Sequence, residues 1–213
     1  MPRLLTDEEL AARVEAACQT VEYKRLVALA LPDLIKHFRL LYAWNQRINL
    51  TSIRDPEEGV RRHLVESVIG AQLLEPVPTD HLVDLGSGNG YPALTLLLIH
   101  HKIRGTLIEK TARKVDFLRA AIRQTNQFER ITVSDSRVIS IDDIPRAATV
   151  VTMRGFPTPQ KWIRELLATR DVRCVVAWLG VDDERALRSA YEGTSLPLGE
   201  GKLVASFLRH AQR

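Results

Sequence analysis

Three glycines at alternate positions, with an aspartate just before them, form the stretch of this chain best suited to hold a ligand. The run is Asp84-Leu85-Gly86-Ser87-Gly88-Asn89-Gly90, between apolar residues 81–83 and an apolar run over 93–99. Glycines let the backbone turn sharply and approach a ligand closely, and a carboxylate here can bind an amine or a hydroxyl group. The spacing differs from the G-x-G-x-x-G of dinucleotide-binding folds, and no Gly-Lys-Ser/Thr of a P-loop is present. The segment therefore predicts a strand, a ligand-binding turn and a helix.

The D-x-G-x-G-x-G form is similar to the first motif of class I S-adenosylmethionine (SAM) methyltransferases. Ligands of open α/β sheets lie beyond the carboxyl ends of the strands, so the next strand ends are candidates too. Glu109, 25 residues after Asp84, can accept hydrogen bonds from both ribose hydroxyls of an adenosyl group; the alternative is a solvated surface acid. Val138 and Ile139 follow the third expected strand, where an adenine would pack. Arg154 follows the fourth, where the methyl group would meet its acceptor.

The residues after the fourth expected strand narrow the class of acceptor. Exocyclic-amine methyltransferases usually carry Asn/Asp-Pro-Pro-Tyr/Phe there, but this chain has Arg154-Gly155-Phe156-Pro157. A pyrimidine C5 methyltransferase needs a cysteine nucleophile near the fourth or fifth strand. Cys174 opens the fifth strand at the end remote from the ligand, and Cys18 is expected in the first helix. Guanine N7 has a lone pair and no proton to lose, so it would fit a site without a base; this reasoning permits an N7 acceptor without establishing one.

The first 75 residues are expected to be helical. Thr6 and Glu9 have the spacing of a capping box before a first helix. Pro32 is expected to open a second helix that ends near Asn45. The run Asp55-Pro56-Glu57-Glu58 is expected to start a third helix, with its aspartate as the N-cap and Glu58 closing a capping box.

From residue 81 the pattern alternates between strand and helix, which is typical of a parallel sheet. A final pair of strands around Gly199-Glu200-Gly201-Lys202 predicts a hairpin that adds an antiparallel edge. The expected strands cover 81–85, 105–109, 130–134, 148–153 and 173–179, and the expected helices cover 92–101, 111–126, 157–169 and 182–191.

These elements predict an α/β fold of the class I SAM-dependent methyltransferase type. The sheet is expected to be Rossmann-like, seven-stranded and mostly parallel, with an antiparallel last strand. An N-terminal helical segment over 1–75 is expected to join a SAM-binding domain over 79–213 in one compact unit, with a hinge at Glu75-Pro76-Val77-Pro78.

The composition fits a cytoplasmic protein. The 213 residues carry a formal net charge of +4, which is compatible with an RNA partner but is also common among ordinary soluble proteins. The two cysteines are far apart in apolar segments and are expected to be reduced, buried thiols. The N-terminus has no signal-peptide pattern, and no apolar run is long enough to cross a membrane. A monomer without a metal site is expected.

Several longer segments carry a more specific resemblance. Together they resemble the RsmG (GidB) family of bacterial 16S rRNA guanine-N7 methyltransferases, over residues from about 36 to about 180. The segments are Tyr42-Ala43-Trp44-Asn45-Gln46-Arg47-Ile48-Asn49-Leu50-Thr51-Ser52-Ile53-Arg54-Asp55-Pro56, Arg62-His63-Leu64-Val65-Glu66-Ser67, the glycine run continued through Tyr91-Pro92, Arg113-Lys114-Val115-Asp116-Phe117-Leu118-Arg119 and Ser136-Arg137-Val138.

The resemblance implies a SAM-dependent enzyme that methylates guanine N7 in the 530-loop region of 16S rRNA, within the small ribosomal subunit. Arg154 matches the arginine of the family's Ser-Arg-Ala, where it would contact the cofactor carboxylate or an RNA phosphate; the alternative is an ion pair with a core carboxylate. The N-terminal helical part and the end of the fourth strand are expected to form one basic RNA-facing surface, with Arg47, Arg54 and Arg137 as RNA-binding residues and Arg61, Arg62 and Arg154 as further candidates. For Arg61 and Arg62 the alternative is a scattered set of solvated charges. The expected cofactor contacts are Asp84, Gly86, Gly88, Tyr91, Glu109, Val138, Ile139 and Arg154.

Three departures from the family pattern lie on the acceptor side. Glu66 replaces the aspartate of H-x-x-D-S, Met153 replaces the serine of Ser-Arg-Ala, and Leu179 replaces the lysine of Leu-Lys-Gly. Two alternatives therefore stay open. One is a methyltransferase of altered substrate, and the other is a noncatalytic SAM- or RNA-binding relative.

Overall fold

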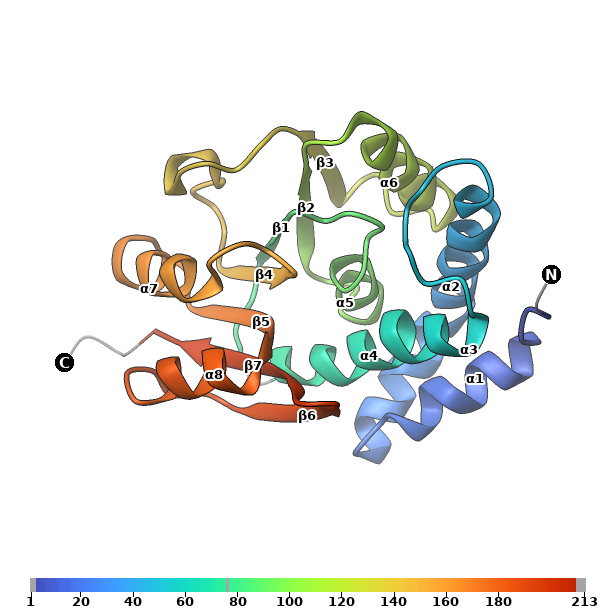
Figure 1. Ribbon diagram of the computed structural model, residues 1–213, viewed down its shortest axis with the longest axis horizontal. Helices are drawn as coiled ribbons and strands as arrows, with labels where there is room; N and C mark the ends of the chain where they lie inside the picture. Colours follow the sequence, from blue (N-terminus) through green and yellow to red (C-terminus); the bar gives the residue numbers. More distant parts are fainter. Residues whose placement is uncertain (1–2, 76, 210–213) are drawn as a thin grey trace.

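The computed structural model describes residues 3–75 and 77–209. A seven-stranded sheet runs through the molecule in the order β3-β2-β1-β4-β5-β7-β6 (Figure 1). Strands β1 to β5 pair in parallel, whereas β7 is antiparallel to both β5 and β6. The predicted fold, with its antiparallel last strand, is confirmed. The strands are β1 (His81–Leu85), β2 (Arg104–Glu109), β3 (Ile131–Asp135), β4 (Val150–Arg154), β5 (Cys174–Gly180), β6 (Ser195–Gly199) and β7 (Lys202–Leu208).

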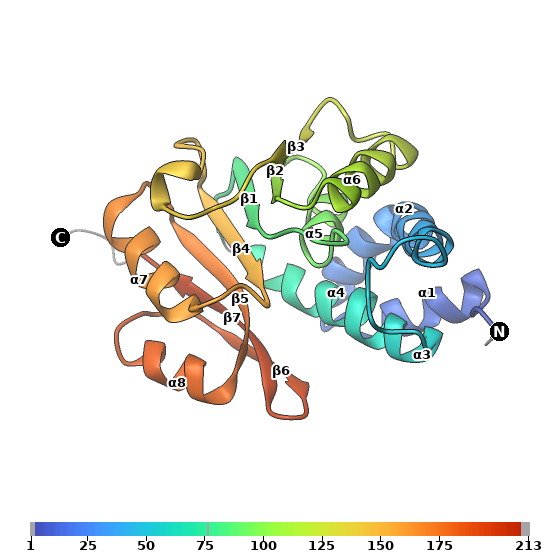
Figure 2. The same cartoon turned by 45° about the horizontal axis from the view of Figure 1, so that its top comes forward.

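Helices cover both faces of this sheet. Helices α1, α2, α4, α5 and α6 lie on one side, and α7 and α8 on the other (Figures 1 and 2). The helices are α1 (Asp7–Ala16), α2 (Val21–Asn45), α3 (Pro56–Gly59), the π-helix η1 (Val60–Val65), α4 (Glu66–Ala71), the 3-10 helix η2 (Gln72–Leu74), α5 (Ala93–Ile99), α6 (Ala112–Gln124), the 3-10 helix η3 (Ile141–Asp143), α7 (Pro159–Thr169) and α8 (Val181–Arg188).

Alternate residues of each strand face opposite layers, as the pleat of a strand requires. Leu82 of β1 belongs to the core beneath α2, α4 and α5, while the next residue, Val83, belongs to the core beneath α7 and α8. The first core also contains Leu34 of α2 and Val68 of α4. The N-terminal helices therefore complete one layer of the sheet.

The caps of the N-terminal helices mostly follow the sequence. Thr6 and Glu9 make the predicted capping box of α1. Asp55 caps α3 by accepting a hydrogen bond from the Glu58 backbone nitrogen, but the Glu58 carboxylate binds Arg61. Pro32 was expected to open the second helix, and this is wrong because α2 begins at Val21 and continues through the proline.

Two further expectations in this region need correction or fall outside the described residues. The third helix begins at Pro56 as expected and continues from α3 through the π-helix η1 into α4. Cys18 follows α1 and does not lie in it, and both it and Cys174 are free thiols. Pro76, at the centre of the expected hinge, lies outside the described residues, and the division into units 1–75 and 79–213 stays a prediction.

Candidate active site

A cavity of about 540 Å³ opens at the carboxyl ends of β1 to β4. Parallel pairing brings these ends together, with Leu85 opposite Met153 and Glu109 opposite Asp135. This is the edge where an open α/β sheet binds its ligand. The lining includes six residues that the sequence singled out, namely Gly86, Glu109, Arg137, Val138, Ile139 and Arg154.

The glycine turn contributes Gly86 to the lining of this cavity. The backbone nitrogens of Gly86 and Ser87 both donate to the Ile108 carbonyl oxygen over 2.9 Å, so the turn is fastened to β2. Gly86 and Gly88 have φ angles of 73° and 56°, a region in which side chains other than glycine are strained. Phe156 lies close beside Gly86, because a Cβ atom there would approach the aromatic ring to 3.2 Å.

Glu109 is buried and holds the turn in place. One carboxylate oxygen accepts from the Gly88 backbone nitrogen over 2.9 Å, and the other accepts from that of Thr111 over 2.8 Å. The side chain is 5% exposed and also lines the cavity. A carboxylate oxygen has lone pairs beyond one hydrogen bond, so Glu109 keeps acceptor capacity toward a ligand. Its alternative role as a solvated surface acid is excluded by its burial.

Asp84 lies behind the turn, between β1 and β4. It is 2% exposed and accepts a hydrogen bond from the Thr152 hydroxyl over 2.6 Å. Burial raises the pKa of its carboxyl to about 6, although the hydrogen bonds from Thr152 and Ser87 act in the opposite direction. Asp84 and Gly88 are not among the residues that line the cavity.

Tyr91 is sandwiched between two histidines beside the turn. Its ring stacks on His37 at 4.3 Å and on His63 at 5.0 Å between centroids. His37 Nε2 lies 2.9 Å from the Asn89 carbonyl oxygen, so this nitrogen carries the proton. Burial lowers the pKa of His37 to about 4 and that of His63 to about 3, which makes both rings neutral near pH 7. The structure does not bring Tyr91 to the cavity wall, and its role as a cofactor contact stays a prediction.

Arg154 lines the cavity and pairs with a core carboxylate, so the ion pair expected as its alternative role is present, and its contact with the cofactor or RNA stays a prediction. Its guanidinium donates to Glu66 Oε2 and to the Arg62 carbonyl oxygen, each over 2.7 Å. Glu66 has a side chain only 4% exposed. The arginine therefore connects the end of β4 to the π-helix η1 and to α4. Glu66, which replaces the aspartate of the family pattern, is the acidic partner in this contact.

The other arginines expected at an RNA surface have different surroundings. Arg54 donates to the Asn45 carbonyl oxygen and to Asn49 Oδ1, so it stabilises the turn after α2. Arg47 lies in the same turn and is exposed, whereas Arg137 is exposed at the cavity. The structure brings Arg137 and Arg154 to the cavity and leaves Arg47 and Arg54 in the turn.

Several residues at the site were missed by sequence reasoning. Phe156 and Trp162 line the cavity and meet edge to face at 5.5 Å. Lys110 and Lys161 also line it. Phe156 directly follows the fourth strand, so its position was a usable signal. Trp162 and Lys161 lie in α7, and no motif marked them.

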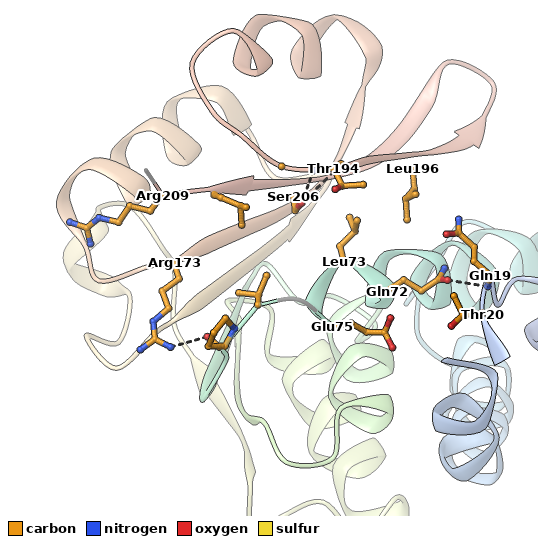
Figure 3. A pocket seen from close by; sticks show the side chains of 14 residues that line it. Gln19, Thr20, Gln72, Leu73, Glu75, Arg173, Thr194, Leu196, Ser206 and Arg209 are labelled. Atoms are coloured by element: carbon orange, nitrogen blue, oxygen red, sulfur yellow. Dashed lines mark hydrogen bonds between the residues drawn. The ribbon is translucent and has the colours of Figure 1, made fainter. Parts of the chain in front are cut away.

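A second cavity, of about 410 Å³, lies at the opposite edge of the sheet, near the start of β5 (Figure 3). Its walls include Gln72 of η2, Ser206 of β7 and Thr194, which directly precedes β6. Gln72 accepts a hydrogen bond from the Gln19 backbone nitrogen over 3.1 Å. None of the residues predicted to bind a ligand lines it.

Within residues 3–75 and 77–209, no three His, Cys, Asp or Glu side chains cluster closely enough to hold a metal ion. The helices of the same ranges are too short or too polar to cross a membrane.

Comparison with known proteins decides the family. The family model described as rRNA small subunit methyltransferase G (GidB) matches residues 30–194. The chain belongs to this family. The ribosomal RNA small subunit methyltransferase G of Xanthomonas euvesicatoria is 33% identical over 156 residues, which cover 72% of this chain and 71% of that protein. The protein of the same name from Stenotrophomonas maltophilia K279a is 35% identical over 144 residues, which cover 67% of this chain and 66% of that protein. Membership confirms the predicted family and its enzyme class, an rRNA methyltransferase that uses SAM.

Solved structures show the same fold at lower identity. An RNA methyltransferase from Salinibacter ruber, in complex with S-adenosyl-L-homocysteine, aligns with a TM-score of 0.52 and 22% identity over 68% of this chain and 92% of its own. A human methyltransferase 10 domain containing protein aligns with a TM-score of 0.55 and 12% identity over 84% of this chain and 98% of its own. These similarities support the class I methyltransferase fold.

Proposed function

We propose that this protein transfers the methyl group of SAM to guanine N7 in the 530-loop region of 16S rRNA in the small ribosomal subunit. The observation that carries the proposal is the cavity at the strand ends, which buried Glu109, Gly86 of the glycine turn and Arg154 line together. Family membership supports the RNA substrate.

The residues of the cavity fit SAM. Its volume of about 540 Å³ lies within the range of about 300–1,000 Å³ typical of small-molecule sites. Glu109 keeps lone pairs for the ribose hydroxyls, and Val138 and Ile139 offer apolar surface to the adenine. Ile139 is 73% exposed, so burial against a flat ring would remove apolar surface from water. Asp84, Gly88 and Tyr91 would act from behind the turn, by holding its shape.

The chemistry asks little of the protein beyond alignment. Bound SAM supplies an electrophilic methyl group, and guanine N7 presents a lone pair without losing a proton. The chain must hold the two in line and exclude water, which is catalysis by proximity and orientation. Arg154 suits this positioning role because two hydrogen bonds of 2.7 Å fix its guanidinium at the end of β4.

The titratable groups near the site also suit a reaction without a general base. His37 and His63 are neutral near pH 7, but the structure buries both in the stack around Tyr91. Asp84 is buried against Thr152. None of the three lines the cavity, so none is within reach of a proton on the acceptor.

The RNA would lie over the acceptor side of the cavity. Arg137, Lys110 and Lys161 line it and add positive charge that attracts phosphates. Arg47 and Arg54 would meet RNA from the turn after α2. We further propose that the protein acts in the cytoplasm as a monomer.

Methyl transfer from radiolabelled SAM to small ribosomal subunits that lack the modification tests the proposal. We expect label in 16S rRNA as N7-methylguanosine, mapped to one nucleotide by mass spectrometry. Label on another base or another RNA would favour a methyltransferase of altered substrate. SAM binding by calorimetry without transfer to any of these RNAs would favour the noncatalytic alternative.

A further inference from the structure

A cluster of ion pairs surrounds Glu66 on the acceptor side of the molecule. Arg154 Nη2 lies 2.7 Å from Glu66 Oε2, while Arg62 Nε and Arg61 Nη1 lie 3.7 and 3.9 Å from Oε1. Glu58 binds Arg61 through two hydrogen bonds of 2.8 Å. Arg61 and Arg62 come from the π-helix η1, and π-helical turns are frequent at functional sites.

Glu200 reaches this cluster from the other end of the chain. It lies at the tip of the hairpin between β6 and β7, and its two carboxylate oxygens lie 3.4 Å from Arg61 Nη2 and 3.6 Å from Arg62 Nη1. The side chain is 65% exposed. Exposed pairs of this length contribute little stability, so another anion can displace the carboxylate.

The backbone of Glu200 does not favour a glutamate. Its φ angle is 54°, between two glycines that also have positive φ angles. Non-glycine residues are uncommon in this left-handed region, and glutamate is not among those enriched there. A two-residue hairpin turn requires positive φ angles, which glycine, asparagine or aspartate adopt more easily than glutamate, and here the turn holds a glutamate carboxylate beside Arg61 and Arg62.

The cluster also contains polar atoms without hydrogen-bond partners. Among the described residues, Arg62 Nε and Glu66 Oε1 are both buried and make no hydrogen bond. These two atoms face each other at 3.7 Å, which is too long for a hydrogen bond. Arg62 is therefore held in the cluster by ion pairs of 3.6 to 3.8 Å, and an anion that replaces Glu200 would meet it at Nη1.

We propose that Arg61 and Arg62 bind a phosphodiester group of the RNA, and that Glu200 occupies this phosphate site in the free protein. This inference rests on the proposed function, because the phosphate belongs to the RNA substrate. Phosphate oxygens match the planar donors of guanidinium groups. When Glu200 leaves, Arg61, Arg62 and Arg154 keep their ion pairs with Glu58 and Glu66, and the loss of one carboxylate gives the cluster a net positive charge for the RNA.

The phosphate site is connected to the acceptor end of the cavity. Arg154 Nη1 donates to the Arg62 carbonyl oxygen, and Arg154 lines the cavity. A phosphate held by Arg61 and Arg62 would therefore lie beside the place where the target guanine must enter. Glu200 would disfavour polyanions that make too few contacts to displace it.

The test compares Glu200→Gln with the wild-type protein for binding of a fluorescent single-stranded 16S rRNA fragment, with salt varied from about 50 to 200 mM. The variant keeps the shape of the side chain and removes its charge. We expect RNA affinity to rise roughly fivefold at low salt, because two weak ion pairs no longer need to break. SAM affinity should stay within twofold.

The matched control is Glu129→Gln, which removes the charge of an exposed acid in the loop before β3. It should change RNA affinity much less than Glu200→Gln. In a second background, Arg61→Gln/Arg62→Gln, the Glu200→Gln change should bring no gain in RNA affinity.

Equal gains in RNA affinity from both glutamate variants, or a gain that survives loss of the two arginines, would overturn the phosphate site. Wild-type methyl transfer without any gain in Glu200→Gln would overturn this inference alone. Absence of both RNA binding and transfer in the wild-type protein would overturn the proposed function with it.

Discussion

At the scale of single residues, Glu109 both supports the glycine turn and lines the cavity. Glu109 accepts hydrogen bonds from the Gly88 and Thr111 backbone nitrogens and lines the cavity. The position of an acid at the end of the second strand was predictable from strand register. Its hydrogen bonds to the glycine turn were not, because they depend on how two loops meet.

Replacing Glu109 with glutamine should weaken both the turn and cofactor binding. The amide cannot accept at both ends, so one backbone N–H group loses its partner, at a cost of about 1–3 kcal/mol in the free energy of unfolding. Loss of the charge should lower SAM affinity roughly tenfold or more, since hydrogen bonds to charged groups contribute about 1.5–3 kcal/mol. Calorimetry and thermal unfolding measure the two effects, and unchanged SAM affinity in the folded variant would remove Glu109 from the cofactor site.

Asp84 should make stability depend on pH in a defined direction. Burial raises the pKa of its carboxyl to about 6 in the folded protein, from 3.8, so the folded state binds the proton more tightly than the unfolded state. The stability that this proton brings is therefore lost as pH rises from about 4 through about 6.

The Asp84→Asn variant removes this pH-dependent penalty and keeps an acceptor for the Thr152 hydroxyl. A pKa difference of this size corresponds to about 3 kcal/mol, so the variant should be more stable than the wild-type protein by up to that amount at pH 8. Near pH 4 the two should unfold alike. Denaturant unfolding at both pH values measures this, and a constant difference between the proteins would contradict the assignment.

At the scale of elements, the local sequence pattern predicts where most strands and helices lie. The features that it does not predict depend on contacts between segments remote in sequence. The hydrophobic runs predicted the strands to within about two residues, because buried parallel strands are continuously apolar. Pro32 does not open a helix, because the 25-residue α2 begins at Val21 and continues through the proline. The stack of Tyr91 between His37 and His63 joins three segments that are far apart in the sequence, so no local motif predicts it.

Arg154 joins β4 to η1 and α4, and only an arginine can make this connection. Its two hydrogen bonds leave in different directions, to Glu66 and to the Arg62 carbonyl oxygen. Arg154→Lys would leave one buried acceptor unpaired, because an ammonium group is a compact donor without the planar fork.

We expect Arg154→Lys to lower the free energy of unfolding by about 2 kcal/mol and to slow methyl transfer through misalignment, while SAM affinity changes less. The control is Arg146→Lys, a change at an exposed arginine in the loop before β4. If the two variants unfold and transfer methyl groups equally well, the contacts of Arg154 with Glu66 and the Arg62 carbonyl oxygen contribute to neither stability nor activity.

At the scale of the whole molecule, the helical segment and the sheet share one core. Leu34 and Val68 lie in the same buried cluster as Leu82 of β1, and Arg154 and Glu66 join the two parts again at the cavity. The sequence predicted that the two parts form one compact unit, but it could not predict which faces meet, because the apolar face of a helix can pack against any apolar surface. The RNA-facing side then combines residues from both parts.

The pH dependence of catalysis tests the proposed chemistry of this assembled site. Burial moves the pKa of His37 to about 4, that of His63 to about 3 and that of Cys174 to about 12, and Asp84 titrates near 6. These groups all titrate outside the range from about pH 7 to 9. Guanine N7 needs no base, so the single-turnover rate of methyl transfer should be nearly flat over that range. The rate should fall below about pH 6 only if protonation of Asp84 disturbs the glycine turn, and Asp84→Asn should remove that fall.

A steep rise of the transfer rate with pH that disappears when one histidine or carboxylate is replaced would reveal a general base. Such a base would point to an acceptor that must lose a proton, and away from N7.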